Sequence, residues 1–206
     1  SVLRSAETND EMQALAMKLT PLLSEHSNSI SLNERLFARI KAVYDQRESA
    51  NLTGEQLQLL QDIYNGFARG GANLQGEQKE KYRELSQKLS LLTLQFSENC
   101  LKETNDYLKV ITDSTLLSGL PESAITAAKE TAQEKGVEGW AFTLHAPSYV
   151  PVMTYADNRD LRKEIYMAYN TQCTHDNEHN NLDEVKELAN TRMEVAQLLG
   201  YKDYAS

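Results

Sequence analysis

Apolar residues recur at helical spacing through most of this chain. In the first stretch, which begins after Asn9 and includes Pro21, they are Met12, Leu15, Ala16, Leu19, Leu22 and Leu23. Side chains three and four positions apart lie on one face of an α-helix. The stretch therefore predicts an amphipathic helix that begins near Asn9 and that Pro21 either kinks or restarts.

Three further helices are expected before residue 106. Asn33 is placed to cap the first. Thr53 and Gln56 have the spacing of a capping box, so a second helix should begin there and end at the Gly70-Gly71 pair. A long third helix should run from about Glu77 to Glu103. The apolar stripes of these helices are, in order, Leu36, Phe37, Ile40, Val43 and Tyr44; Leu57, Leu60, Tyr64 and Phe67; and Tyr82, Leu85, Leu89, Leu92 and Phe96.

The helical pattern lapses in two short segments, Tyr107–Ile111 and Trp140–Leu144. Both alternate in polarity and contain β-branched or aromatic residues, which is typical of strands. We expect them to form a small two-stranded β element. Between them, Pro121 at the start and Gly136 beyond the end predict a helix, because proline favours the first turn and glycine the position after the last.

Two more helices are predicted in the remainder of the chain. Pro147 and Pro151 limit what can follow the second strand. Asn158 and Asn181 then have the positions of helix caps, the second reinforced by Glu184 three residues later. The sequence contains no internal repeat and no low-complexity linker. The expected fold class is mainly α, a multi-helix domain with a minor two-stranded β element.

Composition and charge limit the classes of partner that this chain is expected to bind. The 206 residues are 40% hydrophobic and 25% charged, which suits a folded chain with a core. The formal net charge is −9 and lysine and arginine are scattered, so nucleic acid is an unfavoured partner. No apolar run approaches the roughly 20 residues of a membrane helix, so no membrane partner is expected. The cytoplasm is favoured over the periplasm. Cys100 and Cys173 form no close motif and are expected to be free thiols.

One string resembles a catalytic motif. His175-Asp-Asn-Glu178-His179 fits the His-x-x-Glu-His pattern of inverted zinc peptidases, in which two histidines on one helix face hold zinc and the glutamate activates water. However, the string lies in a polar stretch between two predicted helices, where Asn and Asp favour a turn. No third ligand follows at a recognisable spacing. We interpret the string as a connecting loop, and a stand-alone zinc peptidase is the less favoured alternative.

Three single residues also suggest chemistry. Arg192 falls on the inward stripe of the final helix, which is Val185, Leu188, Val195 and Leu199. An unpaired buried charge costs several kcal/mol, so a buried or interfacial ion pair is predicted; a substrate contact and an exposed helix edge are the alternatives. His26 is expected at the end of the first helix, where the helix dipole favours it. His145 has no partner at triad spacing and is interpreted as structural.

Four segments, taken in order along the chain, resemble one family of enzymes. They are Arg35-Leu-Phe-Ala-Arg-Ile-Lys-Ala-Val, Trp140-Ala-Phe-Thr-Leu, Asn158-Arg-Asp-Leu-Arg-Lys-Glu-Ile-Tyr-Met-Ala-Tyr and Arg192-Met-Glu-Val-Ala-Gln-Leu-Leu-Gly-Tyr. Together they are similar to the thimet oligopeptidase family of zinc peptidases, and most nearly to its bacterial peptidyl-dipeptidase branch. One departure is that Gln172, followed by Cys173, stands where relatives commonly have an arginine, which puts any ion pair of that arginine in doubt.

The resemblance implies a mostly helical, two-lobed enzyme with a deep channel that admits short peptides. It also implies that the enzyme releases dipeptides from the C-termini of these peptides. The family holds zinc with a His-Glu-x-x-His helix and a later glutamate, and this sequence contains no such motif. Those residues normally lie beyond position 206, and Lys202-Asp203-Tyr204-Ala205 already indicates a new helix. Residues 1–206 are therefore expected to be the N-terminal channel-wall region of a larger peptidase.

For this region the resemblance implies no catalytic, cofactor-binding or metal residue and no activity of its own. Zinc belongs to the parent enzyme, and the expected partners are the missing C-terminal catalytic part of the same chain and short peptide substrates. The alternative from another class is an autonomous helical interaction module.

Overall fold

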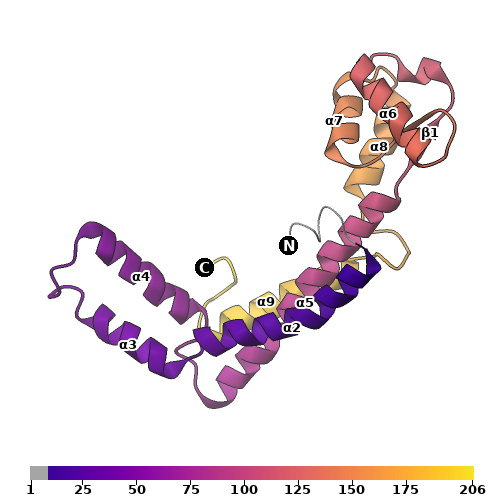
Figure 1. Ribbon diagram of the computed structural model, residues 1–206. Helices are drawn as coiled ribbons and strands as arrows, with labels where there is room; N and C mark the ends of the chain where they lie inside the picture. The colour runs from indigo at the N-terminus through magenta and orange to yellow at the C-terminus, as the bar shows by residue number, and fades with distance from the viewer. Residues whose placement is uncertain (1–8) are drawn as a thin grey trace. The chain divides into compact units, whose positions relative to one another are not determined.

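The computed structural model describes residues 9–206 (Figure 1). It is mainly α-helical with one two-stranded antiparallel sheet, so the predicted fold class is confirmed. The chain divides into two compact units. One contains the described residues up to Gln95 together with Glu184–Ser206, and the other contains Phe96–Asp183. Among the described helices, none has the length and apolar character that crossing a membrane requires.

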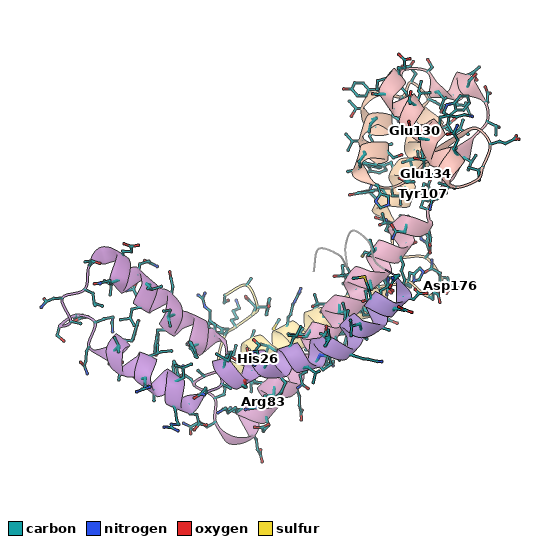
Figure 2. All side chains as sticks on the ribbon, in the orientation of Figure 1. His26, Arg83, Tyr107, Glu130, Glu134 and Asp176 are labelled. Atoms are coloured by element: carbon teal, nitrogen blue, oxygen red, sulfur yellow. The ribbon has the colours of Figure 1, made fainter. Side chains whose placement is uncertain are left out.

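The first unit is built from helices, of which α3 and α4 begin at their predicted caps. Its elements are α2 (Asp10–Ser31), α3 (Glu34–Asp45), α4 (Gly54–Arg69), the first part of α5 (Gly76–Asp106) and most of α9 (Leu182–Leu198). The Asn9 side chain accepts a hydrogen bond from the backbone N–H of Met12 at 2.8 Å, and Asn33 accepts one from Leu36 at 3.0 Å. α2 continues through Pro21 as one helix. His26 therefore lies inside α2 and is exposed, so its predicted place at the helix end is wrong (Figure 2).

Stacked aromatic rings join α3 to α4. The predicted capping box is confirmed, because the Thr53 hydroxyl accepts from the Gln56 N–H and the Gln56 side chain accepts from the Thr53 N–H. The rings of Tyr44 and Tyr64 stack with centroids 3.8 Å apart, and Phe37 stacks on Tyr64 at 5.7 Å. Phe37 is the one buried residue of α3, and the inward residues of α4 are half-buried. The hairpin is thus held by a row of rings and has little enclosed core.

In the same unit, α2 contacts α5 through polar side chains. The Ser86 hydroxyl lies 3.3 Å from Asn28 Oδ1, and the Ser90 hydroxyl lies 3.4 Å from that of Ser24. Arg83 of α5 pairs with Glu25 of α2 at 3.3 Å. The buried residues of α2 are Ser24 and Asn28, although the apolar pattern placed its leucines inward. Polar side chains therefore form part of the contact between α2 and α5.

The second unit folds around a short β-ribbon. Its elements are the last part of α5, β1 (Lys109–Ile111), the 3-10 helix η1 (Ser114–Leu117), α6 (Glu122–Glu134), β2 (Trp140–Phe142), α7 (Ala146–Tyr155) and α8 (Arg159–Asn170). β1 and β2 pair antiparallel, with Lys109 opposite Phe142 and Ile111 opposite Trp140, as the two-stranded prediction required. α7 was not predicted, yet it accommodates Pro147 in its first turn and Pro151 inside.

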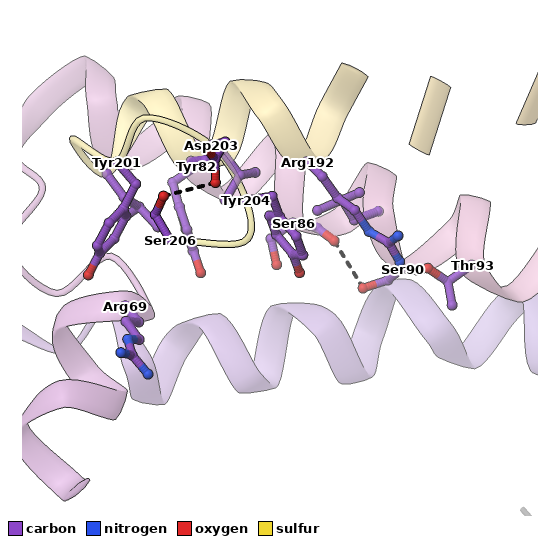
Figure 3. A pocket seen from close by; sticks show the side chains of 14 residues that line it. Arg69, Tyr82, Ser86, Ser90, Thr93, Arg192, Tyr201, Asp203, Tyr204 and Ser206 are labelled. Atoms are coloured by element: carbon purple, nitrogen blue, oxygen red, sulfur yellow. Dashed lines mark hydrogen bonds between the residues drawn. The ribbon is translucent and has the colours of Figure 1, made fainter. Parts of the chain in front are cut away.

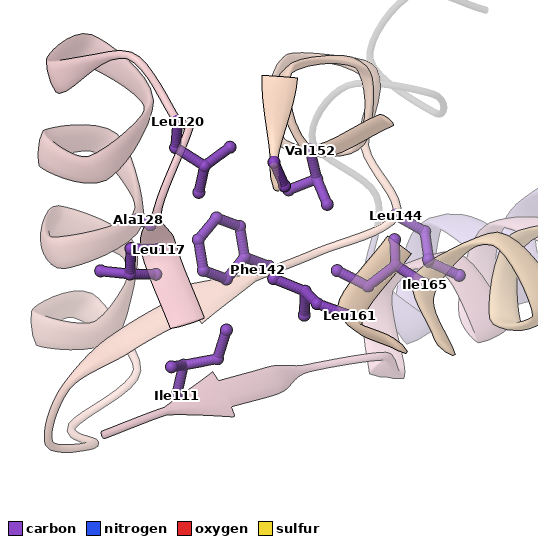
Figure 4. Close-up of a cluster of buried hydrophobic side chains, with 10 residues drawn as sticks. Ile111, Leu117, Leu120, Ala128, Phe142, Leu144, Val152, Leu161 and Ile165 are labelled. Carbon is purple, nitrogen blue, oxygen red and sulfur yellow. The ribbon is translucent and has the colours of Figure 1, made fainter. Parts of the chain in front are cut away.

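Apolar side chains from both strands and from α6, α7 and α8 enclose the core of this unit (Figure 4). Phe142 is 1% exposed, and Val152 and Ile165 are fully buried. Gly139 allows the turn before β2, because its φ is +97° and an added Cβ would lie 2.1 Å from the Ile111 carbonyl oxygen.

Candidate functional site

The His175–His179 string lies in the loop between α8 and α9, as predicted. The two histidines contact different carboxylates. His175 Nδ1 lies 2.5 Å from Glu103 Oε1, whereas His179 Nε2 lies 3.6 Å from Asp106 Oδ2 and 3.7 Å from Glu178 Oε1. The rings therefore do not converge on one point.

The arrangement of these side chains does not suit a metal ion. Within residues 9–206, no three or more His, Cys, Asp or Glu side chains are grouped so that they could hold a metal ion. The string also lacks the helix on which the inverted zinc peptidases align their histidines. The described residues do not fit a zinc site, so no reaction step can be assigned to zinc held by them.

Glu103, near the end of α5, organises this loop. Its Oε1 pairs with His175, and its Oε2 accepts the backbone N–H of Cys173. Burial alone would raise the pKa of Glu103, but the hydrogen bonds from His175 and Cys173 outweigh burial and lower the pKa below its ordinary value. Cys173 has φ +57°, a left-handed conformation that this hydrogen bond helps to hold. Periodicity gave no signal for this cluster, since its members are about 70 positions apart.

Two buried asparagines join the same loop to α5. Asn99 Nδ2 donates to Asn181 Oδ1 at 2.8 Å, and Asn181 Nδ2 donates to the Phe96 carbonyl oxygen at 3.1 Å. α9 does begin directly after Asn181, but the Leu182 N–H donates to Asn180 Oδ1 at 2.9 Å. The prediction that Asn181 serves as the helix cap missed its main contacts, because the amide binds the neighbouring helix.

Gln172, the residue that departs from the family pattern, also contacts α5. Its Nε2 donates to Thr104 Oγ1 at 2.7 Å. A neutral amide therefore fills this position with a hydrogen bond and needs no ionic partner. The loop is held to α5 by Gln172, Cys173, His175 and Asn181, and we call these contacts the loop anchor.

A second candidate lies in the first unit, where α5, α9 and the C-terminal segment form a groove of about 640 Å³ (Figure 3). Tyr82, Ser86 and Ser90 face it from α5, and Arg69 reaches it from the end of α4. Burial raises the pKa of Tyr82 above its ordinary value. Apolar side chains of Leu89, Val195 and Leu199 complete the lining. Such a groove can accept an anionic group attached to an apolar one, for example a peptide terminus.

Arg192 lines this groove and is exposed, so the predicted buried ion pair is wrong. Its guanidinium lies 5.5 Å from the centroid of the Tyr204 ring, a cation-π contact. The position that faces inward is Thr191, which is fully buried between Leu188 and Val195 along the helix. A stripe through 188, 191 and 195 leaves residue 192 on its edge. Within this chain Arg192 is therefore exposed, whereas an interfacial ion pair or a substrate contact in the whole protein stays a prediction.

The remaining histidine candidate, His145, is exposed at the N-cap position of α7. Its carbonyl oxygen accepts the N–H groups of Ser148 and Tyr149, each at 2.9 Å. The backbone of this residue thus has a structural role in starting α7. Among the described residues, no Ser, Cys or Asp side chain is hydrogen-bonded to the His145 ring.

Comparison with known proteins shows which family this chain is similar to. Residues 152–206 match the family model described as peptidase family M3. The whole chain is 36% identical to oligopeptidase A of Escherichia coli and 37% identical to oligopeptidase A of Salmonella typhimurium, and covers 31% of each. Over 98% of its length it is 32% identical to dipeptidyl carboxypeptidase of Escherichia coli, of which it covers 30%.

These relatives confirm the resemblance to a peptidase family that the sequence indicated. The homologues of this chain are oligopeptidases and a dipeptidyl carboxypeptidase of family M3, and the matched part is their N-terminal part. The chain spans about a third of the length of these curated relatives. The sequence identity to oligopeptidase A is 36%, and the identity to dipeptidyl carboxypeptidase is 32%. These values do not support the expected greater likeness to the peptidyl-dipeptidase branch.

Proposed function

We propose that this chain forms the N-terminal helical channel-wall region of a zinc-dependent oligopeptidase. The observation that carries the proposal is the 36% identity to oligopeptidase A over the whole chain, which covers only 31% of that relative. The catalytic groups and the zinc would then come from the C-terminal part of the same protein. The helices described above would limit the channel to short peptides and help to exclude water from the reaction.

The architecture supports a scaffold role. The loop anchor holds the α8–α9 connection to α5 through hydrogen bonds from four residues. α9 exposes 48% of Val185 and 40% of Met193, although both are apolar. An autonomous interaction module would be expected to have polar outward faces on its terminal helices, so these exposed residues favour a further part of the protein as their cover.

The inactivity of the chain by itself can be tested directly. The purified chain is mixed with an internally quenched short peptide and zinc, and oligopeptidase A of Escherichia coli serves as the positive control. We expect no turnover by the chain. Turnover that a chelator abolishes, together with zinc retained through gel filtration, would defeat the proposal and would favour the His175, Glu178 and His179 alternative.

The activity of the full-length protein is tested by its products. We expect cleavage of short peptides and no cleavage of folded proteins, because the channel would exclude them. The 32% identity to dipeptidyl carboxypeptidase supports a second candidate, release of C-terminal dipeptides. Mass spectrometry of the products separates the two candidates, since cleavage at internal bonds of an amidated peptide contradicts a requirement for a free C-terminus. Location in the cytoplasm remains our proposal and is tested by cell fractionation.

A further inference from the structure

The fold brings the two cysteines of the chain together. Cys100 lies on α5 and Cys173 lies in the loop after α8, 73 positions later, and their Sγ atoms are 3.7 Å apart. Both are free thiols in this structure, and the sequence contains no other cysteine. A disulfide has an S–S distance of about 2.05 Å, so the sulfur atoms would have to approach by roughly 1.7 Å. Rotation of the two side chains is a motion of this size.

Other contacts hold both cysteines where they are. The Cys173 backbone N–H donates to Glu103, which is three residues after Cys100 on α5. Asn181 Nδ2 lies 3.4 Å from Cys100 Sγ and also donates to the Phe96 carbonyl oxygen. The contacts of the Cys173 N–H with Glu103 and of Asn181 with Phe96 do not involve the sulfur atoms, so they can stay in place when the sulfur atoms approach each other. Prepositioned thiols react with each other in preference to a second chain.

We propose that Cys100 and Cys173 are a redox-active pair that forms an intramolecular disulfide in the presence of a low-molecular-weight disulfide such as oxidised glutathione. The Cys100 sulfur attacks one glutathione sulfur, forms a mixed disulfide and releases one glutathione. The Cys173 sulfur then attacks Cys100, forms the protein disulfide and releases the second glutathione. Two protein thiols are oxidised and oxidised glutathione is reduced to two thiols, and each glutathione that leaves takes up one of the two protons.

Burial decides the order of the two steps. Cys100 is half-buried, whereas Cys173 is 3% exposed, so an oxidant from solution reaches Cys100 first. Burial raises the pKa of the Cys173 thiol, and the neighbouring Glu103 carboxylate raises it further. Cys173 therefore reacts as the second, resolving thiol, and ring closure should become faster as the pH rises.

The first experiment measures how much the fold favours the bond. The chain is equilibrated in buffers of graded ratios of reduced to oxidised glutathione, quenched in acid and weighed by mass spectrometry, once folded and once in urea. We expect a product lighter by two hydrogen atoms. The effective concentration of one protein thiol relative to the other should be at least about tenfold higher in the folded chain than in the unfolded one, because folding brings the thiols together.

Two results would overturn the proposal. One is an effective concentration in the folded chain equal to or below that of the unfolded chain. The other is accumulation of glutathione adducts or disulfide-linked dimers in place of the internal bond. Neither result bears on the peptidase proposal, which does not involve the thiols.

Variants assign the steps to individual residues. Cys173→Ser should stop at a single glutathione adduct on Cys100, and Cys100→Ser should react more slowly than Cys173→Ser. Glu103→Gln should lower the effective concentration severalfold because it weakens the contact that positions Cys173. Glu77→Gln, which changes an exposed carboxylate on the same helix, is the matched control and should have no effect. Equal values for Glu103→Gln and Glu77→Gln would contradict the role of Glu103 as a positioning residue.

A thermal melt provides a readout that does not depend on trapping. The bond would link α5 to the loop after α8 and close a long segment of the second unit, which restricts its unfolded state. We expect the oxidised chain to melt at least about 5 °C above the reduced chain, and reduction to restore the lower value. An oxidised chain that melts lower would show that the bond strains the fold, contrary to the proposal.

Discussion

The two units of this chain differ in how completely their apolar side chains are covered. The second unit encloses apolar residues, since Phe142 is 1% exposed and Ile165 is fully buried. In the first unit, the buried residues of α2 are Ser24 and Asn28, while Leu22 and Leu23 are 66% and 65% exposed. No residue of α4, which is described throughout, is buried. An amphipathic pattern therefore produced a closed core in one unit and a partly uncovered surface in the other.

This difference has an energetic consequence. Burial of apolar surface supplies about 25 cal/mol per Å² and is the main favourable term in folding. Helices with exposed leucines obtain less of it, and their local unfolding should need less free energy. We therefore expect the second unit to be the more stable one, and the following experiments test this comparison.

The largest effect is expected for Phe142→Ala. Removal of this ring leaves a cavity against Ile111 and Val152, which should lower the free energy of unfolding of the second unit by about 3–5 kcal/mol. Urea titration monitored by the fluorescence of Trp140 measures the change, because Trp140 is the only tryptophan and lies in β2. The control is Leu23→Ala, for which we expect less than about 0.5 kcal/mol. Similar losses for both variants would refute the contrast between the units.

The close backbone approach at Gly139, directly before β2, should also be sensitive to substitution. Gly139→Ala places a Cβ 2.1 Å from the Ile111 carbonyl oxygen at a φ of +97°, and should cost about 2–3 kcal/mol. Gly136 is the matched control, because its φ is +67° but no atom lies within 4 Å of an added Cβ. Gly136→Ala should cost about 1 kcal/mol, the conformational part alone. The same urea titration compares them, and equal losses would mean that the close approach is not rigid.

In the first unit we expect a local effect from Phe37→Ala. The variant removes the ring that stacks on Tyr64 and Phe67, and should cost about 2 kcal/mol, less than Phe142→Ala because its neighbours are half-buried. Amide hydrogen exchange read by mass spectrometry should show faster exchange in α3 and α4. The urea midpoint of Trp140 fluorescence should not change, and a shift of that midpoint would show that the units unfold together.

The sequence predicted the elements well because their signals are local. Caps and periodic stripes involve residues within four positions, so Asn33, Thr53 and Asn158 identified helix starts that the structure confirms. α7 was missed because Pro147 and Pro151 are read as breakers, although proline is tolerated in a first turn. The division into units was also invisible, since α5 passes from one unit into the other without a linker.

Candidate chemistry was predicted less well, because it depends on contacts between distant segments. The pattern gave the loop at His175 correctly but could not place Glu103 beside it, 72 positions away. The cysteines were expected to be free thiols, and they are free, but the sequence did not indicate that they lie 3.7 Å apart. Arg192 was misplaced by one position, because stripes through residues 188 and 195 allow either 191 or 192 between them. The role of the chain in catalysis stays a prediction.

A smaller effect is expected from a change of pH, and it should act on the second unit, which contains Glu103. The pKa of Glu103 is lowered from 4.5, so its contribution to the stability of the folded loop anchor is complete above that pH and is lost as the pH falls below it. The free energy of unfolding seen by Trp140 should therefore fall on acidification, by well under the Phe142→Ala loss. Glu103→Gln should show a shallower fall over the same pH range. An identical pH dependence in the variant would exclude Glu103 as its source.

The smallest change is expected at Arg192. Its side chain is exposed and its cation-π contact is with Tyr204, which is itself 60% exposed, so Arg192→Ala should alter the free energy of unfolding by no more than about 0.5 kcal/mol. Leu188→Ala on the same helix removes a side chain that is 7% exposed and should cost about 2–3 kcal/mol. Thermal melts followed by circular dichroism compare the two variants, since Trp140 does not lie in this unit. A large loss of unfolding free energy in Arg192→Ala would support the buried ion pair after all. It would also mean that the first unit is more enclosed than its exposed leucines indicate.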